Sequence, residues 1–130
     1  MAEKVLDNSV KDRIPPIFID DHNTGETYTL DFNRDSVVFA EARGFEIDNV
    51  LKFPETGFRE IFFLAFRMHH GPKNGNISRT KTDAIYASLG GFSPEFLERL
   101  IMLYNQAAQS NNIVETTEEM GKNSNMTVKL

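Results

Sequence analysis

The chain of 130 residues contains no cysteine and no tryptophan. Without cysteine it can form no disulfide bond, no thiolate metal site and no thiol nucleophile. Basic residues are also few, 14 against 19 acidic residues, which gives a net charge of −5. An acidic chain lacks the positive charge with which proteins neutralise phosphates. We therefore expect no nucleic-acid partner.

Long apolar runs are missing as well. The longest, residues 61–66, is far shorter than the roughly 20 residues that a membrane-spanning helix requires. Residues 1–13 are charged and polar and contain no apolar core of a signal peptide. These features predict a cytoplasmic protein with no membrane partner.

The sequence offers little catalytic chemistry. His69 and His70 are adjacent, so on a helix their side chains point about 100° apart and cannot grip one metal ion together. They are better explained as cations near the negative end of a helix dipole. His22 lies in a separate turn, and neither a nucleophile elbow nor a glycine-rich phosphate loop is present. We expect no catalytic residue, no metal and no cofactor, and hence no enzyme.

Composition divides the chain into three parts. Residues 1–16 are expected to form a flexible N-terminal segment, 17–110 a single globular domain, and 111–130 a flexible polar tail rich in Asn, Thr, Glu and Ser. Within the tail, residues 126–130 are a candidate docking segment.

The domain should begin with a β-hairpin. Residues 17–19 suit a short strand, 20–25 a turn, and 26–32 alternate polar with apolar or aromatic side chains. This alternation places Tyr28, Leu30 and Phe32 on one face. Two strands alone are marginally stable, so the hairpin needs a helix beneath it or a third strand from a partner.

Helices should follow the hairpin. Their expected positions are 34–43 after the N-cap Asn33, 55–70, 79–89 after Ser78, and 94 onward after Ser93, with a further helical turn within 45–51. Ala84, Ile85 and Leu89 would form the buried side of the third of these. The predicted fold class is mainly α with a small N-terminal β-hairpin (α+β), with about four helices around a Phe-rich central helix.

That central helix, residues 55–70, is apolar on most of its sides. Such a helix is usually buried at the centre of its domain, and the alternative is that part of its surface binds another protein. For the alternative, the candidate binding residues on this helix and on the last one are Phe58, Ile61, Phe62, Phe63, Phe66, Met68, Phe96, Leu100, Leu103 and Tyr104.

A basic patch surrounds the loop after the central helix. A solvated turn explains it most simply, an acidic protein partner is the functional alternative, and a nucleic-acid backbone is less favoured. Its members are Arg67, Lys73, Arg79 and Lys81.

Four segments together resemble a known family. They are residues 28–37 (YTLDFNRDSV), 62–70 (FFLAFRMHH), 77–83 (ISRTKTD) and 97–104 (LERLIMLY). Their order and spacing are similar to those of tail assembly chaperones of long-tailed, siphovirus-type phages and prophages of Gram-positive bacteria. The resemblance covers about residues 26–106.

The resemblance implies a function. Chaperones of this family bind the hydrophobic tape-measure protein, keep it soluble and recruit tail-tube subunits in the host cytoplasm, and are absent from the finished virion. Separately from the resemblance, the apolar surface around most of the central helix exceeds what one small chain readily covers, which predicts self-association into a homo-oligomer. Two alternatives stay open, a structural head–tail adaptor or tail-completion protein, and a small DNA-binding regulator.

The assignment of residues 111–130 to a tail is testable by truncation. A chain that ends at Ser110 should keep its fold, because the removed residues contribute little apolar surface to a core. Circular dichroism and thermal unfolding of the truncated protein provide the measurement. Loss of cooperative unfolding would contradict the domain boundary.

Overall fold

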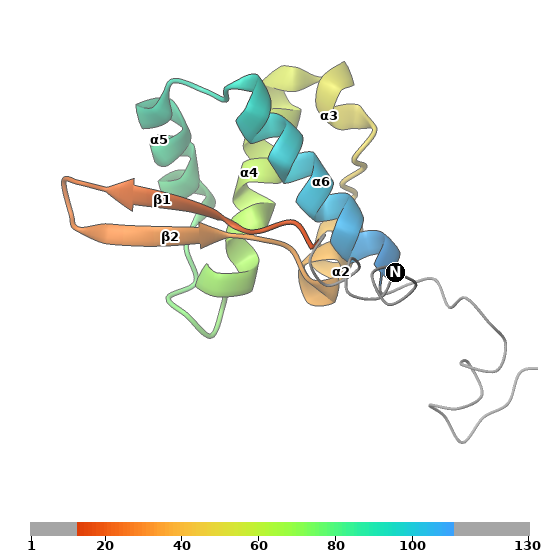
Figure 1. Ribbon diagram of the computed structural model, residues 1–130, viewed down its shortest axis with the longest axis horizontal. Coiled ribbons are helices and arrows are strands. Elements are labelled where there is room, and N and C mark those ends of the chain that lie inside the picture. Colours follow the sequence, from red (N-terminus) through yellow and green to blue (C-terminus); the bar gives the residue numbers. More distant parts are fainter. Residues whose placement is uncertain (1–12, 111–130) are drawn as a thin grey trace, which may run out of the picture.

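Residues 13–110 are the part of the chain that the computed structural model describes (Figure 1). The predicted tail 111–130 therefore lies outside the described residues, as does most of the predicted N-terminal segment. The elements in chain order are β1 (Ile17–Asp21), β2 (Glu26–Leu30), α2 (Arg34–Ala42), α3 (Asn49–Lys52), α4 (Pro54–His70), α5 (Arg79–Leu89) and α6 (Pro94–Ser110). The predicted fold class, mainly helical with an N-terminal hairpin, is confirmed.

Strands β1 and β2 form an antiparallel hairpin in the register that pairs Ile17 with Leu30. The alternation of polar and apolar side chains gives the hairpin one apolar and one mostly polar face. Tyr28, Leu30 and Phe32, which were predicted to share one face, are all buried, while Phe18 on the opposite face is 64% exposed. The hairpin extends sideways from the helices, and its turn is the part farthest from them (Figure 1). One face of the hairpin thus belongs to the core.

Helix α4 is the centre of the domain. It packs against β2, α2, α3, α5 and α6, so neighbours cover it on nearly all sides. The ring of Phe62 is fully buried and contacts aromatic rings from three other segments, Tyr86 in α5, Phe92 in the following loop and Phe96 in α6. These centroid distances of 5.6–6.1 Å lie in the range that favours tilted and edge-to-face packing. The Phe-rich helix is therefore a core helix.

The helix ends follow the capping residues in the sequence. Asn33 accepts a hydrogen bond from the Ser36 amide, and Ser36 Oγ in turn accepts one from the Asn33 amide, so the two form a capping box at α2. Ser78 and Ser93 cap α5 and α6 by one hydrogen bond each, which their hydroxyl oxygens accept from the amides of Lys81 and Phe96. Gly90 ends α5 in the left-handed conformation, with φ of 76°.

The structure corrects the predicted N-terminal boundary of the domain and the predicted buried face of α5. Ile14, which lies within the segment 1–16 that was expected to be flexible, belongs to the domain, because its amide donates to Gln106 Oε1 at 2.8 Å and its side chain packs on the core. In α5 the buried side is formed by Thr82 with the partly buried Ile85 and Tyr86. Ile85 was expected there, but the other two predicted residues, Ala84 and Leu89, are not part of it. Ala84 is exposed and Leu89 is 43% exposed. The helix is thus rotated relative to the expectation.

Gly57 allows α3 and α4 to approach closely. A Cβ atom at this position would lie 2.9 Å from both Cα and O of Val50, which are backbone atoms that a rotamer change cannot move. Val50 is itself buried. Glycine is therefore required here by space, although its φ is not positive.

We expect Gly57→Ala to destabilise the domain. In an open helix this change would stabilise by up to about 1 kcal/mol, but here the overlap with Val50 should cost about 1–3 kcal/mol. Urea unfolding followed by circular dichroism measures the difference. Thr56→Ala, at the exposed neighbouring position, is the control and should leave stability unchanged or slightly raised. An equally stable Gly57→Ala protein would contradict the close approach.

Candidate protein-binding groove

Helix α4 closes one edge of the hairpin. The Thr29 amide donates a hydrogen bond to His70 Nε2 at 3.0 Å, and the Asp31 amide donates one to the Ala65 carbonyl at 3.0 Å. Both amides point away from β1, in keeping with the alternating pattern of an antiparallel pair. The outer edge of β2, which would otherwise be free to pair with another strand, is thus satisfied within the domain.

The other edge of the hairpin is open. Because Phe18 pairs with Thr29 and Asp20 pairs with Thr27, the same alternation directs the amides of Phe18 and Asp20 away from β2. Among residues 13–110, the close packing of β1 is with β2, on the paired edge. The open edge of β1 therefore presents backbone donors and acceptors that a further strand could use.

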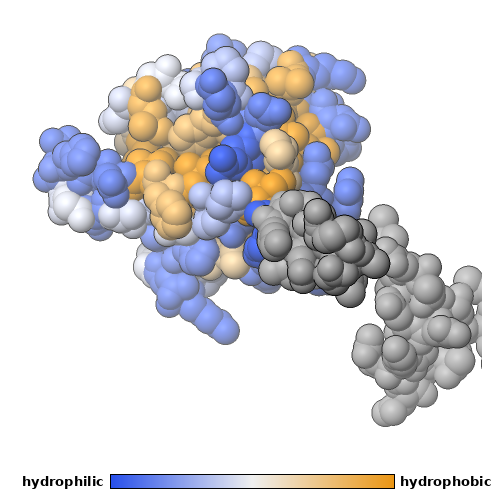
Figure 2. Space-filling model, viewed as in Figure 1, coloured by the Kyte–Doolittle hydropathy of each residue, from blue (hydrophilic) through white to orange (hydrophobic). Residues whose placement is uncertain are grey.

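A groove separates this hairpin from α5. It has a cavity volume of about 340 Å³, and its apolar lining comes from both sides, Ile19 and Tyr28 in the hairpin and Ala84, Ile85 and Leu89 in α5. Figure 2 shows hydrophobic surface over α5 and between this helix and the hairpin. We call this feature the hairpin–α5 groove. Its apolar floor lies beside β1, because Ile19, Asp20 and Asp21 of this strand also line the groove.

The turn end of the groove is acidic. Asp20 and Asp21 line it together with His22, and Lys81 lies on the α5 side. The Tyr28 hydroxyl donates to Glu26 Oε1 at 2.6 Å, and this hydrogen bond, with burial, raises the pKa of Tyr28 to about 12. Tyr28 therefore remains a neutral, protonated part of the floor. The charges at this end favour a ligand that carries a basic group.

The structure corrects most of the binding surface expected on α4 and α6. Six of the ten candidate residues lie in the core, at 0–4% exposure, because their helices face each other and the hairpin. A partner cannot reach them in the folded domain, and the alternative of a central core helix is confirmed. The six are Ile61, Phe62, Phe66, Leu100, Leu103 and Tyr104.

The remaining four candidates, Phe58, Phe63, Met68 and Phe96, are partly exposed, so their role in binding stays a prediction. The most exposed large apolar side chains lie elsewhere and are not among the predicted binding residues. A single exposed side chain leaves no periodic signal, and only the strand alternation placed Phe18 opposite the core face. The exposed large apolar residues are Phe18, Val38, Leu51, Phe53, Leu89 and Met102.

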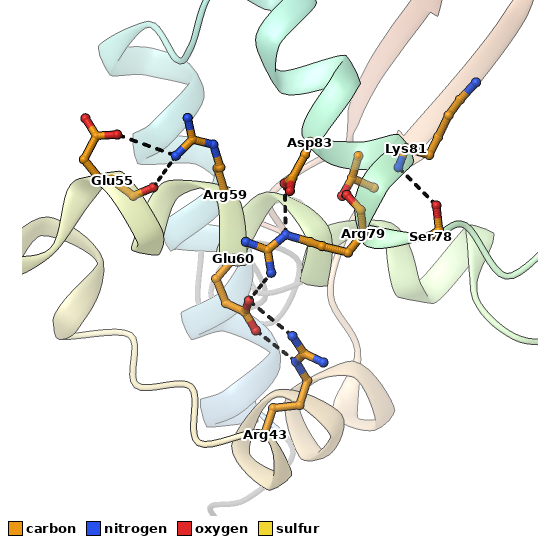
Figure 3. A network of polar contacts seen from close by, with 9 residues as sticks. Arg43, Glu55, Arg59, Glu60, Ser78, Arg79, Lys81 and Asp83 are labelled. Carbon is orange, nitrogen blue, oxygen red and sulfur yellow. Dashed lines mark hydrogen bonds and ion pairs between the residues drawn. The ribbon is translucent and has the colours of Figure 1, made fainter.

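The two arginines of the basic patch form ion pairs within the domain. Arg79 pairs with Glu60 at 2.6 Å and with Asp83 at 2.9 Å, and Glu60 also pairs with Arg43 (Figure 3). Partial burial opposes the charge of Arg79, but the hydrogen bonds and charges of the two carboxylates outweigh it and raise the pKa of its guanidinium. This network ties α5 to α4 and to the end of α2.

Arg67 is occupied in the same manner. It pairs with Asp35 at 3.2 Å, and its guanidinium lies 4.0 Å from the centre of the Phe39 ring. Such cation–π contacts contribute about 0.5–1 kcal/mol at exposed sites. Of the expected patch, Lys73 and Lys81 are the exposed members, and Lys81 belongs to the groove. Arg67 and Arg79 therefore connect elements of the domain and are not a free basic surface for a partner.

His70 also differs from expectation. A ring nitrogen that accepts a hydrogen bond carries no proton, so the bond from Thr29 requires a neutral imidazole rather than a cation. Burial and the neighbouring His69 lower the pKa of His70, against a smaller opposing effect of Glu26. His70 therefore acts as a neutral anchor for β2, while His69 is exposed at the helix end.

Other kinds of site are not apparent in the described part of the chain. Residues 13–110 contain no group of three or more His, Asp or Glu side chains placed to hold a metal ion. In the same residues, no helix is both long and apolar enough to cross a membrane.

Comparison with known proteins assigns the chain to a family. Residues 1–130 match the family described as "Domain of unknown function (DUF5055)". The chain therefore belongs to the DUF5055 family. No curated protein and no solved structure matches it.

Protonation of His70 should weaken the domain in mild acid. Its pKa is lowered in the folded state from an unfolded value of about 6.5. Below that pH the unfolded chain gains a proton that the folded chain resists, so stability falls as pH decreases from about 6.5. Urea unfolding at several values between pH 5 and 7.5 measures this dependence.

His70→Ala should remove the part of this dependence that His70 causes and cost about 0.5–1.5 kcal/mol at pH 7.5, since the Thr29 amide loses its acceptor. His69→Ala should keep most of the dependence, because burial lowers the pKa of His70 more than His69 does. Equal pH profiles for the native protein and His70→Ala would contradict the neutral anchor.

Proposed function

We propose that this protein is a tail assembly chaperone of a long-tailed phage or prophage, which binds the tape-measure protein in the host cytoplasm. Its binding keeps the tape measure soluble and helps to recruit tail-tube subunits, and the chaperone does not remain in the virion. The resemblance of residues 28–37, 62–70, 77–83 and 97–104 to that family supplies the specific role.

The hairpin–α5 groove is the structural observation that supports the proposal. A chaperone needs an apolar surface that stays open in its own folded state, and the buried residues of α4 and α6 do not provide one. The groove has such a surface, formed by Leu89 and Ala84 beside Ile19. Each methylene group of a partner that is covered there contributes about 0.8 kcal/mol.

The dimensions of the groove fit transient binding. It lies between a strand of five residues and a helix of 11 residues, so a single occupant covers much less surface than a stable complex. Interfaces of less than about 1,200 Å² in total are usually weak. Weak binding by many copies along a tape measure allows the copies to be displaced when tube subunits assemble.

Co-expression with the tape-measure protein encoded nearby tests the proposal. The native chain should increase the soluble fraction of the tape measure and co-purify with it. Leu89→Lys and Ala84→Lys each place a charge in the groove at an exposed helical position, so the fold should persist. Both changes together should reduce co-purification at least tenfold, which corresponds to about 1.4 kcal/mol.

Val38→Lys is the matched control, because Val38 is also an exposed apolar residue on a helix but lies outside the groove. This variant should co-purify like the native chain. Equal loss in all variants, or no binding by the native chain, would contradict the proposal. Abundant peptides of this protein in purified virions would favour the structural-component alternative instead.

A further inference from the structure

The geometry of the hairpin–α5 groove selects an extended ligand over a helical one. An α-helix satisfies its own backbone groups by hydrogen bonds within the helix, so a helical ligand could not use the open donors and acceptors of β1. A strand can use them when it lies about 4.8 Å from its neighbour. Ile19, Asp20 and Asp21 of β1 line the groove, so a strand beside the open edge of β1 would gain backbone hydrogen bonds and border the apolar lining.

The chemistry of the groove also restricts the sequence of such a strand. The floor calls for apolar side chains at alternate positions, directed towards Ile85 and Leu89. The outer face of β1 carries Phe18 and Asp20, and the turn end adds Asp21. A suitable ligand therefore has apolar residues at every second position and a basic residue between them.

Residues 126–130 of this chain have that composition. Met126, Val128 and Leu130 are apolar and alternate with Thr127 and Lys129. In a strand, the three apolar residues would share the face that meets α5. Lys129 would share the outer face with Asp20, where opposite charges on neighbouring strands stabilise pairing.

The connection to the domain is long enough. Helix α6 ends at Ser110, and its last turns lie beside the start of β1, because Gln106 Oε1 accepts from the Ile14 amide. The 16 steps from Ser110 to Met126 span up to about 50 Å when extended. The five residues of β1 are only about 17 Å long. Either strand direction is therefore within reach.

We propose that residues 126–130 bind in the hairpin–α5 groove as a third strand beside β1, and so compete with the tape measure for this site. The competition rests on the proposed function, but the strand addition does not. A tethered segment has an effective concentration near the millimolar range, so even weak pairing fills the groove when no partner is present. A two-stranded hairpin also gains stability from a third strand.

Amide hydrogen exchange of the full-length protein, followed by NMR, tests the strand addition without any tape-measure protein. The amides of Phe18 and Asp20 face the open edge, so residues 126–130 should protect them. Val128→Asp places a charge on the apolar floor and should speed their exchange at least tenfold. Thr116→Asp adds the same charge to the tail outside the segment and should leave their exchange unchanged.

The amides of Thr29 and Asp31 serve as an internal reference, because α4 accepts their hydrogen bonds. They should stay protected in every variant, which separates release of the tail from unfolding of the hairpin. Fast exchange of Phe18 and Asp20 in the native chain would overturn the inference, as would an equal effect of both substitutions. Protection that disappears on tenfold dilution would also overturn it, since a second copy would then cover the edge.

Discussion

The hydrogen bonds between β2 and α4 determine how the rest of the domain is arranged. They join the outer amides of Thr29 and Asp31 to His70 and Ala65, and so hold the hairpin against the central helix. One edge of the hairpin is thereby closed and the other is left open. Because two strands alone are marginal, this anchoring, together with burial of Tyr28, is what makes a stable hairpin available as one wall of the groove.

The same arrangement explains why the chain contains 11 phenylalanine residues. A domain of about 100 residues that places one helix at its centre must fill the space around that helix from several directions. Phe62 does this by contacting Phe66, Tyr86, Phe92 and Phe96. Since these rings pack against each other, they leave little apolar surface on α4 for a partner. The binding surface has to lie on elements at the periphery, and α5 with the hairpin is the place where two such elements leave a gap.

Much of this fold could be predicted from local patterns, and the site only in part. The alternation of Tyr28, Leu30 and Phe32 and the capping residues Asn33, Ser78 and Ser93 act over a few residues, so the hairpin and the helix starts were predicted closely. The face of α5 was not, because its weak periodicity does not decide between Leu89 and Tyr86. The pairing of Arg67 with Asp35 spans 32 residues of sequence and leaves no local signal. Leu89 lines the groove only because the fold places the hairpin beside α5, and no local sequence pattern reports that contact.

In the proposed role, an open strand edge above an apolar floor has an advantage over a preformed side-chain pocket. Backbone hydrogen bonds along β1 do not depend on the sequence of the ligand, and the floor asks only for apolar side chains at alternate positions. A chaperone for a long partner must bind many segments that differ in sequence, and this combination tolerates such variation. The same tolerance would admit the chain's own residues 126–130. Self-occupation keeps the edge covered until a partner arrives, which also limits the edge-to-edge aggregation that an open strand invites.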